Sequence, residues 1–116
     1  DSEALKLAAA ELALESGVKV AAGTDCGAPG HPHGTLAEEL TLMVEAGASP
    51  MEAIRCGTAA AADLLGLGGE VGTLEPGKRA DLLAVGGDPL GDVRALKETR
   101  LVLRGGAEVF SRDGTR

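Results

Sequence analysis

The fold of this chain is decided by the stretch VKVAAGTDCGAPGHPHG, residues 18–34. It opens with a short, mostly apolar run, which predicts a buried strand over residues 18–22. Residues 4–15, just before it, are rich in strong helix formers with an apolar stripe, and predict a helix. A helix, a short buried strand and a polar loop at the carboxyl end of the strand are typical of an α/β protein.

Two helix starts follow the loop. Residues 35–38 (TLAE) and residues 49–52 (SPME) both have the pattern of a capping box, in which a hydroxyl and a glutamate satisfy backbone N–H groups at the start of a helix. We therefore expect one helix over residues 35–46 and a second over residues 50–65.

The second half of the chain is rich in strand and turn signals. The sequence predicts strands over residues 80–85, 99–104 and 107–110, one helical turn over residues 93–96, and a two-residue hairpin turn at Gly105–Gly106. We expect a division into a helix-rich part, residues 1–67, and a small antiparallel β unit, residues 68–116. Lys78 and Arg79 should be solvated charges, whereas Asp81 should accept hydrogen bonds from backbone N–H groups near a strand edge.

The bulk composition limits the class of protein. The chain has 116 residues, one aromatic side chain, 18 glycines and a net charge of −7. The acidic balance argues against nucleic acid and anionic membranes as partners, and no apolar run approaches the length of a membrane span. A core made of Ala, Leu and Val suggests faces that meet partners outside this chain. The interpretation is a soluble protein, cytoplasmic by default.

The loop after the predicted strand holds the residues that could carry chemistry: Asp25, Cys26, His31 and His33. An aspartate at the end of a buried strand lies where α/β enzymes place their reactive groups, but it could equally form a turn or cap a helix. The two histidines could belong to an exposed loop or, with Asp25 and Cys26, to a small metal site. Cys26 is expected to be a small buried side chain rather than a nucleophile, and both cysteines are expected to be reduced. The chain has no phosphate-binding glycine loop, which excludes nucleotide binding.

Four segments carry a resemblance to a known family. They are AAGTD (21–25), HGTLAEELTLMVEAGASPMEAIRCGTAAAADLLGL (33–67), VGTLEPGKRADLLAVGGDPL (71–90) and LVLRGGAEV (101–109). In this order and spacing, they resemble the carboxyl-terminal part of an amidohydrolase-superfamily enzyme of the imidazolonepropionase and Xaa-Pro dipeptidase-like branch. The resemblance covers nearly the whole chain.

The resemblance implies a fold and an activity. The fold would be a (β/α)8 barrel with a β-sandwich, in which residues 18–22 form the eighth barrel strand and residues from 71 onward return to the sandwich. The parent protein would hydrolyse amide, peptide or cyclic C–N bonds of a small molecule with metal-activated water, and the expected metal is zinc. By this match Asp25 is the metal ligand and general base, and His33 is a substrate contact.

The family's other metal ligands and its lysine have no counterpart in this chain, because they belong to earlier barrel strands. We therefore expect an incomplete site in a fragment, a partner half or a remnant, completed by the missing barrel portion or by another copy of the chain in a homo-oligomer. A first residue other than methionine fits a piece of a longer protein. The alternative from a different class is a non-catalytic α+β module that self-associates.

Overall fold

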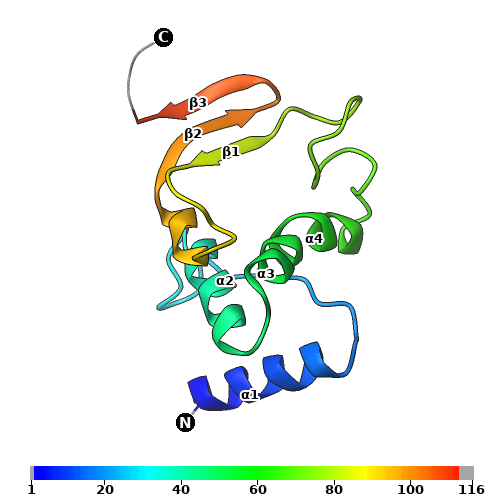
Figure 1. Ribbon diagram of the computed structural model, residues 1–116, viewed down its shortest axis with the longest axis vertical. Coiled ribbons are helices and arrows are strands. Elements are labelled where there is room, and N and C mark those ends of the chain that lie inside the picture. Colours follow the sequence, from blue (N-terminus) through cyan, green and yellow to red (C-terminus); the bar gives the residue numbers. More distant parts are fainter. Residues whose placement is uncertain (1, 113–116) are drawn as a thin grey trace.

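The computed structural model describes residues 2–112 and arranges them as a group of helices beside a three-stranded sheet (Figure 1). The helices are α1 (Ser2–Glu15), α2 (Leu36–Glu45), α3 (Pro50–Gly57) and α4 (Ala59–Leu64), with a 3-10 helix η1 (Val93–Lys97). The strands are β1 (Leu82–Val85), β2 (Thr99–Arg104) and β3 (Ala107–Ser111). Helices α1 to α4 precede the sheet in the sequence, and the mixture of helices with a small antiparallel sheet confirms the expected classes of element.

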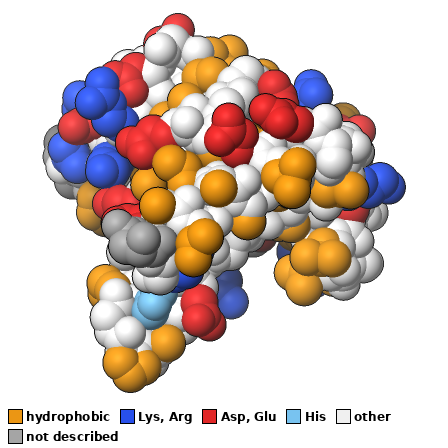
Figure 2. Space-filling view, turned by 90° about the horizontal axis from the view of Figure 1, so that it is seen from below, with side chains coloured by type: hydrophobic (Ala, Val, Ile, Leu, Met, Phe, Trp, Pro, Cys, Tyr) orange, Lys and Arg blue, Asp and Glu red, His pale blue; other side chains and the backbone are white. Residues whose placement is uncertain are grey.

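Helix α1 confirms the helix expected over residues 4–15, but its apolar stripe is not buried. Leu5 is 72% exposed and Leu12 is 68% exposed. No residue of α1 is fully buried, and Leu14 only reaches the edge of the core. Seen from below, the molecule shows apolar side chains open to solvent (Figure 2). The apolar face of α1 is therefore left uncovered by the other described residues.

The strand predicted over residues 18–22 is wrong for the chain as described. This segment is drawn out between α1 and α2 (Figure 1), but it forms no β-ladder, since the sheet of the described residues pairs only β1, β2 and β3. A strand needs a neighbour to receive its backbone hydrogen bonds, and none of the strands formed by residues 2–112 pairs with this segment. A single backbone bond ties the segment to the helices: the Ala22 N–H donates to the Cys56 carbonyl at 2.8 Å. Val20 and Ala22 pack against the core.

One of the two expected capping boxes forms. At the start of α3, the Glu52 N–H donates to Ser49 Oγ at 3.1 Å and the Ser49 N–H donates to Glu52 Oε1 at 3.3 Å. The box expected at residues 35–38 is wrong. Thr35 has φ −107° and ψ 15° and makes no side-chain cap bond. Its hydroxyl donates back to the Pro32 carbonyl at 3.1 Å, so it secures the preceding loop instead.

The helix expected over residues 50–65 is broken at Thr58, which separates α3 from α4. At Gly57, α3 packs so closely on α2 that a Cβ added to this glycine would lie 3.2 Å from Leu40 Cδ2. Thr58 then leaves helical geometry, with φ −128° and ψ −90°, while its hydroxyl donates to the Ile54 carbonyl at 2.7 Å. A hydroxyl bonded to the preceding turn bends a helix, so close approach and this bond together explain the break.

The core is small and lies between α2, α3 and η1. Its buried members are Leu40, Met43, Ala48, Ala53, Cys56 and Val93. The helical turn expected at residues 93–96 is confirmed as η1, and its Val93 closes the core from the side of the sheet. No helix within residues 2–112 is long and apolar enough to cross a bilayer.

The sheet has the order β1-β2-β3 and is antiparallel throughout. Its register places Leu83, Val102 and Phe110 in one cross-strand row. The predicted hairpin turn is confirmed: Gly105 and Gly106 have φ values of 58° and 84°, which a tight turn between twisted strands requires. The expectation for Asp81 is also confirmed, because Asp81 Oδ1 accepts the Gly105 N–H at 2.8 Å.

Candidate active-site loop

Asp25 stands where the extended segment ends and the loop begins. Its φ of +54° makes it the one non-glycine residue with positive φ in residues 2–112. Such a backbone is uncommon for any residue with a Cβ, although aspartate tolerates it better than most. The side chain is exposed. Within residues 2–112, no hydrogen bond or ion pair holds its carboxylate.

Three hydrogen bonds fix the backbone around this position. The Cys26 N–H donates to Thr24 Oγ1 at 3.2 Å. The Gly27 N–H donates to the His31 carbonyl at 2.8 Å, and the His31 N–H donates to the Ala28 carbonyl at 2.9 Å. The loop is therefore folded on itself rather than extended. Thr24 was not predicted as part of the site, although a threonine two residues before a turn amide is a recognised turn signal.

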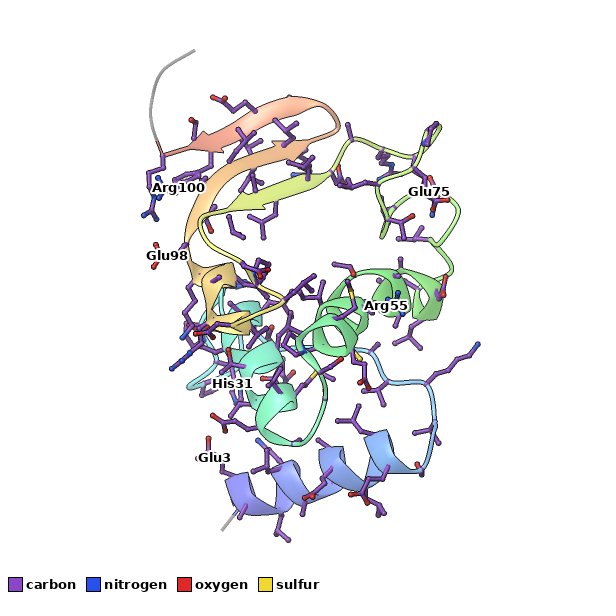
Figure 3. All side chains as sticks on the ribbon, viewed as in Figure 1. Glu3, His31, Arg55, Glu75, Glu98 and Arg100 are labelled. Carbon is purple, nitrogen blue, oxygen red and sulfur yellow. The ribbon has the colours of Figure 1, made fainter. Side chains whose placement is uncertain are left out.

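The loop opens onto a cleft of about 960 Å³ between α1 and α2. Thr24, Asp25 and His31 line it from the loop. In Figure 3, His31 lies beside α2, and Glu3 lies below it at the start of α1. Besides Asp25, the carboxylates around the cleft are those of Glu3, Glu39 and Glu45, and Lys6 supplies a cation. The excess of carboxylates suits a positively charged ligand.

The proposed four-residue metal site does not form. No group of three or more His, Cys, Asp or Glu side chains is placed to hold a metal within residues 2–112. The loop geometry explains this. His31 lines the cleft with Asp25, whereas His33 is exposed and its Nε2 would lie 3.8 Å from a Cβ added at Gly27. His33 therefore lies beside Gly27 and is not among the residues that line the cleft; its role as a substrate contact stays a prediction.

The two cysteines differ in environment. Cys26 is exposed, so its prediction as a buried side chain is wrong: the turn at Asp25 directs it outward. Cys56 is buried in the core, and burial, helped by the charge of Glu52, raises the pKa of its thiol. Both are free, as expected.

A second charged group lies far from the cleft, in the loop between α4 and β1 (Figure 3). Lys78 was expected to be solvated, but its side chain is only 17% exposed and its Nζ lies 3.0 Å from Glu75 Oε2. The Glu75 carboxylate accepts hydrogen bonds from the Thr73 hydroxyl and from Lys78. Together they hold the pKa of Glu75 below its ordinary value, and the Thr73 bond has the larger effect. Arg79 is exposed as expected, yet pairs with Glu70 at 3.0 Å. The turn at Pro76–Gly77, closed by the bond from the Lys78 N–H to the Glu75 carbonyl at 3.2 Å, brings Lys78 back to Glu75.

The sequence profile of the amidohydrolase family matches residues 3–109. The chain belongs to this family. The amidohydrolase chain is 39% identical over 79 residues to an imidazolonepropionase of Geobacillus kaustophilus, covering 67% of this chain and 19% of that protein. It is 39% identical over 98 residues to an ochratoxinase of Aspergillus niger, covering 83% of this chain and 20% of that protein.

Solved structures give the same picture. A Xaa-Pro dipeptidase crystallised with methionine in its active site superposes with a TM-score of 0.82 at 39% identity, over 88% of this chain and 25% of that one. The amidohydrolase chain thus spans about a fifth of the length of the curated relatives it matches and a quarter of this structure. Its elements are those of part of a larger fold.

Proposed function

We propose that the protein to which this chain belongs hydrolyses amide, peptide or cyclic C–N bonds, with Asp25 as metal ligand and general base. The observation that carries the proposal is the position of Asp25. In a chain of the amidohydrolase family, an exposed carboxylate at the end of an extended segment lines a cleft. Its oxygens are free to bind a ligand, because no side chain of the described residues occupies them.

The chemistry of Asp25 fits a divalent metal, for which we propose zinc. A carboxylate oxygen is an accepted zinc ligand, but a stable site needs three or four ligands. This chain supplies one, so the others must come from the remainder of the parent protein. A bound zinc would act as a Lewis acid and lower the pKa of water. Asp25 itself would accept the proton of the attacking water and pass it to the leaving amine.

The proposed place of the chain in the parent protein rests on residues 18–22, whose backbone pairs with no strand of the described residues. We propose that residues 18–22 form the eighth strand of a (β/α)8 barrel, that residues 1–67 are its closing part, and that residues 68–116 are the carboxyl-terminal part of a β-sandwich. Support comes from the extended segment, which packs Val20 and Ala22 on the core while its backbone lacks ladder partners. The missing barrel portion or another copy of the chain would complete the site.

The names of the relatives suggest small-molecule substrates with an amide, peptide or cyclic C–N bond: a Xaa-Pro dipeptidase, an ochratoxinase and an imidazolonepropionase. His33 is proposed as a substrate contact, since it lies on the same loop as Asp25. The two free cysteines suit a reducing compartment, which keeps the cytoplasm as the proposed location.

The test uses the full-length parent protein, loaded with zinc and offered a panel of Xaa-Pro dipeptides and other amides. We expect turnover, and we expect Asp25→Asn to lower kcat by at least about a hundredfold, the usual contribution of a general base. Asp63→Asn is the matched control, because Asp63 is an exposed aspartate of α4 outside the cleft. An Asp25→Asn enzyme within tenfold of wild type would sink the proposal. Concentration-dependent self-association without turnover would favour the non-catalytic module.

A further inference from the structure

The backbone turns at Asp25, whose φ is +54°. A positive φ is uncommon for a residue with a Cβ. The two residues before it, Gly23 and Thr24, line the same cleft as Asp25. The direction of the carboxylate thus depends on keeping an uncommon backbone conformation.

The structure shows one side-chain contact that spans this turn. Thr24 Oγ1 accepts the Cys26 N–H at 3.2 Å, so the bond encloses Asp25 between its two ends. Thr24 is half-buried, whereas Asp25 and Cys26 are exposed. A hydroxyl that bonds the amide two residues ahead mimics a backbone turn and stabilises it. No other side chain of residues 2–112 hydrogen-bonds to the backbone of Asp25 or Cys26.

We infer that Thr24 is a positioning residue for Asp25: its hydroxyl, by accepting the Cys26 N–H, holds the left-handed backbone that aims the carboxylate into the cleft. The inference rests on the proposed function of Asp25. Thr24 itself would not touch the reacting atoms. It acts by restricting the conformations of its neighbour, and preorganisation of this kind affects the rate of the chemical step more than binding.

The variants that test this differ only in the hydroxyl. Thr24→Val keeps the shape and removes the acceptor, Thr24→Ala removes it with less bulk, and Thr24→Ser restores it. In the full-length zinc-loaded protein, with a Xaa-Pro dipeptide as substrate, we expect the Val and Ala variants to lose about three- to tenfold in kcat, the value of one net hydrogen bond. KM should change less than about twofold, and the Ser variant should match wild type.

Other results would overturn the inference. The hydroxyl does not position the base if the Val and Ala variants both keep the wild-type kcat, or if only KM rises. The same conclusion follows if the Ser variant loses as much kcat as the Val and Ala variants. Unfolding of both variants, followed by circular dichroism, would show a general structural role instead. Asp25→Asn separates the two proposals. If that variant is inactive while the Thr24 variants match wild type, only the positioning role fails; if it is fully active, the proposed function fails.

Discussion

Replacing Gly72 by alanine should destabilise the chain strongly. Gly72 has φ +101°, a conformation that L side chains rarely adopt. An added Cβ would lie 2.8 Å from the Ala62 Cβ and 3.3 Å from the Ala59 Cα of α4. Carbon atoms prefer about 3.5–4.0 Å, and neither neighbour is the end of a flexible side chain. The backbone conformation costs about 1–2 kcal/mol and the overpacking about 1–3 kcal/mol, so we expect a loss of roughly 2–5 kcal/mol.

The assay is urea unfolding of the purified chain, followed by the helical signal in circular dichroism, with Gly69→Ala as the matched control. Gly69 lies in the same loop, has no positive φ in the forbidden range and has open space where its Cβ would be. Its substitution should change the free energy of unfolding by less than about 0.5 kcal/mol. Adding Ala62→Gly to Gly72→Ala should recover part of the loss, since the two sites are in contact. Equal stability of the Gly72 and Gly69 variants would refute the packing of this loop against α4.

Three further predictions concern single contacts. Ser49→Ala should lower the free energy of unfolding by about 1 kcal/mol in urea titration, whereas Thr35→Ala should cost less than half of that, because only Ser49 caps a helix; equal losses would contradict the assignment. A maleimide probe at neutral pH should label Cys26 at once and Cys56 only on unfolding, because burial protects the Cys56 thiol and raises its pKa. Mass spectrometry of the folded chain measures the labelling, and equal labelling of both cysteines would contradict the burial of Cys56. The pKa of Glu75 is lower in the folded chain than in the unfolded chain, so its ionised carboxylate stabilises the fold above the unfolded pKa, and this contribution is lost as pH falls through the folded pKa. In an acid titration of the free energy of unfolding, Glu75→Gln should lose less stability than wild type between these two pKa values.

Local signals in the sequence predicted the parts of the fold that depend on neighbouring residues. The Ser49 cap, the Gly105–Gly106 turn and the acceptor role of Asp81 each involve a turn chemistry that a short stretch specifies. The resemblance to the family identified Asp25 as the candidate, and the structure places it on the cleft. Its left-handed backbone was not predicted, because aspartate adopts that conformation only in particular contexts.

The errors arise where the outcome depends on distant or missing parts. Residues 18–22 form no strand here because a ladder needs a partner that these residues cannot supply themselves. The break at Thr58 depends on how closely α3 approaches Leu40 of α2, a contact that helix propensity cannot reveal. The Thr35 hydroxyl could cap the following helix or bond to the preceding loop. In the structure it donates to the Pro32 carbonyl of that loop, which a local helix signal does not predict.

The single tie between Ala22 and Cys56 has a consequence for amide exchange with deuterated solvent. Within residues 18–22, the Ala22 N–H is the one with a backbone acceptor in the structure, so the amides before it should exchange quickly. A strand that docked on one edge of this segment would slow alternate amides, because successive N–H groups of a strand point to opposite edges. The exchange rates of the amides in residues 18–22 therefore report whether another strand has docked beside the segment that leads to Asp25. Mass spectrometry can measure these rates residue by residue, without substrate or metal.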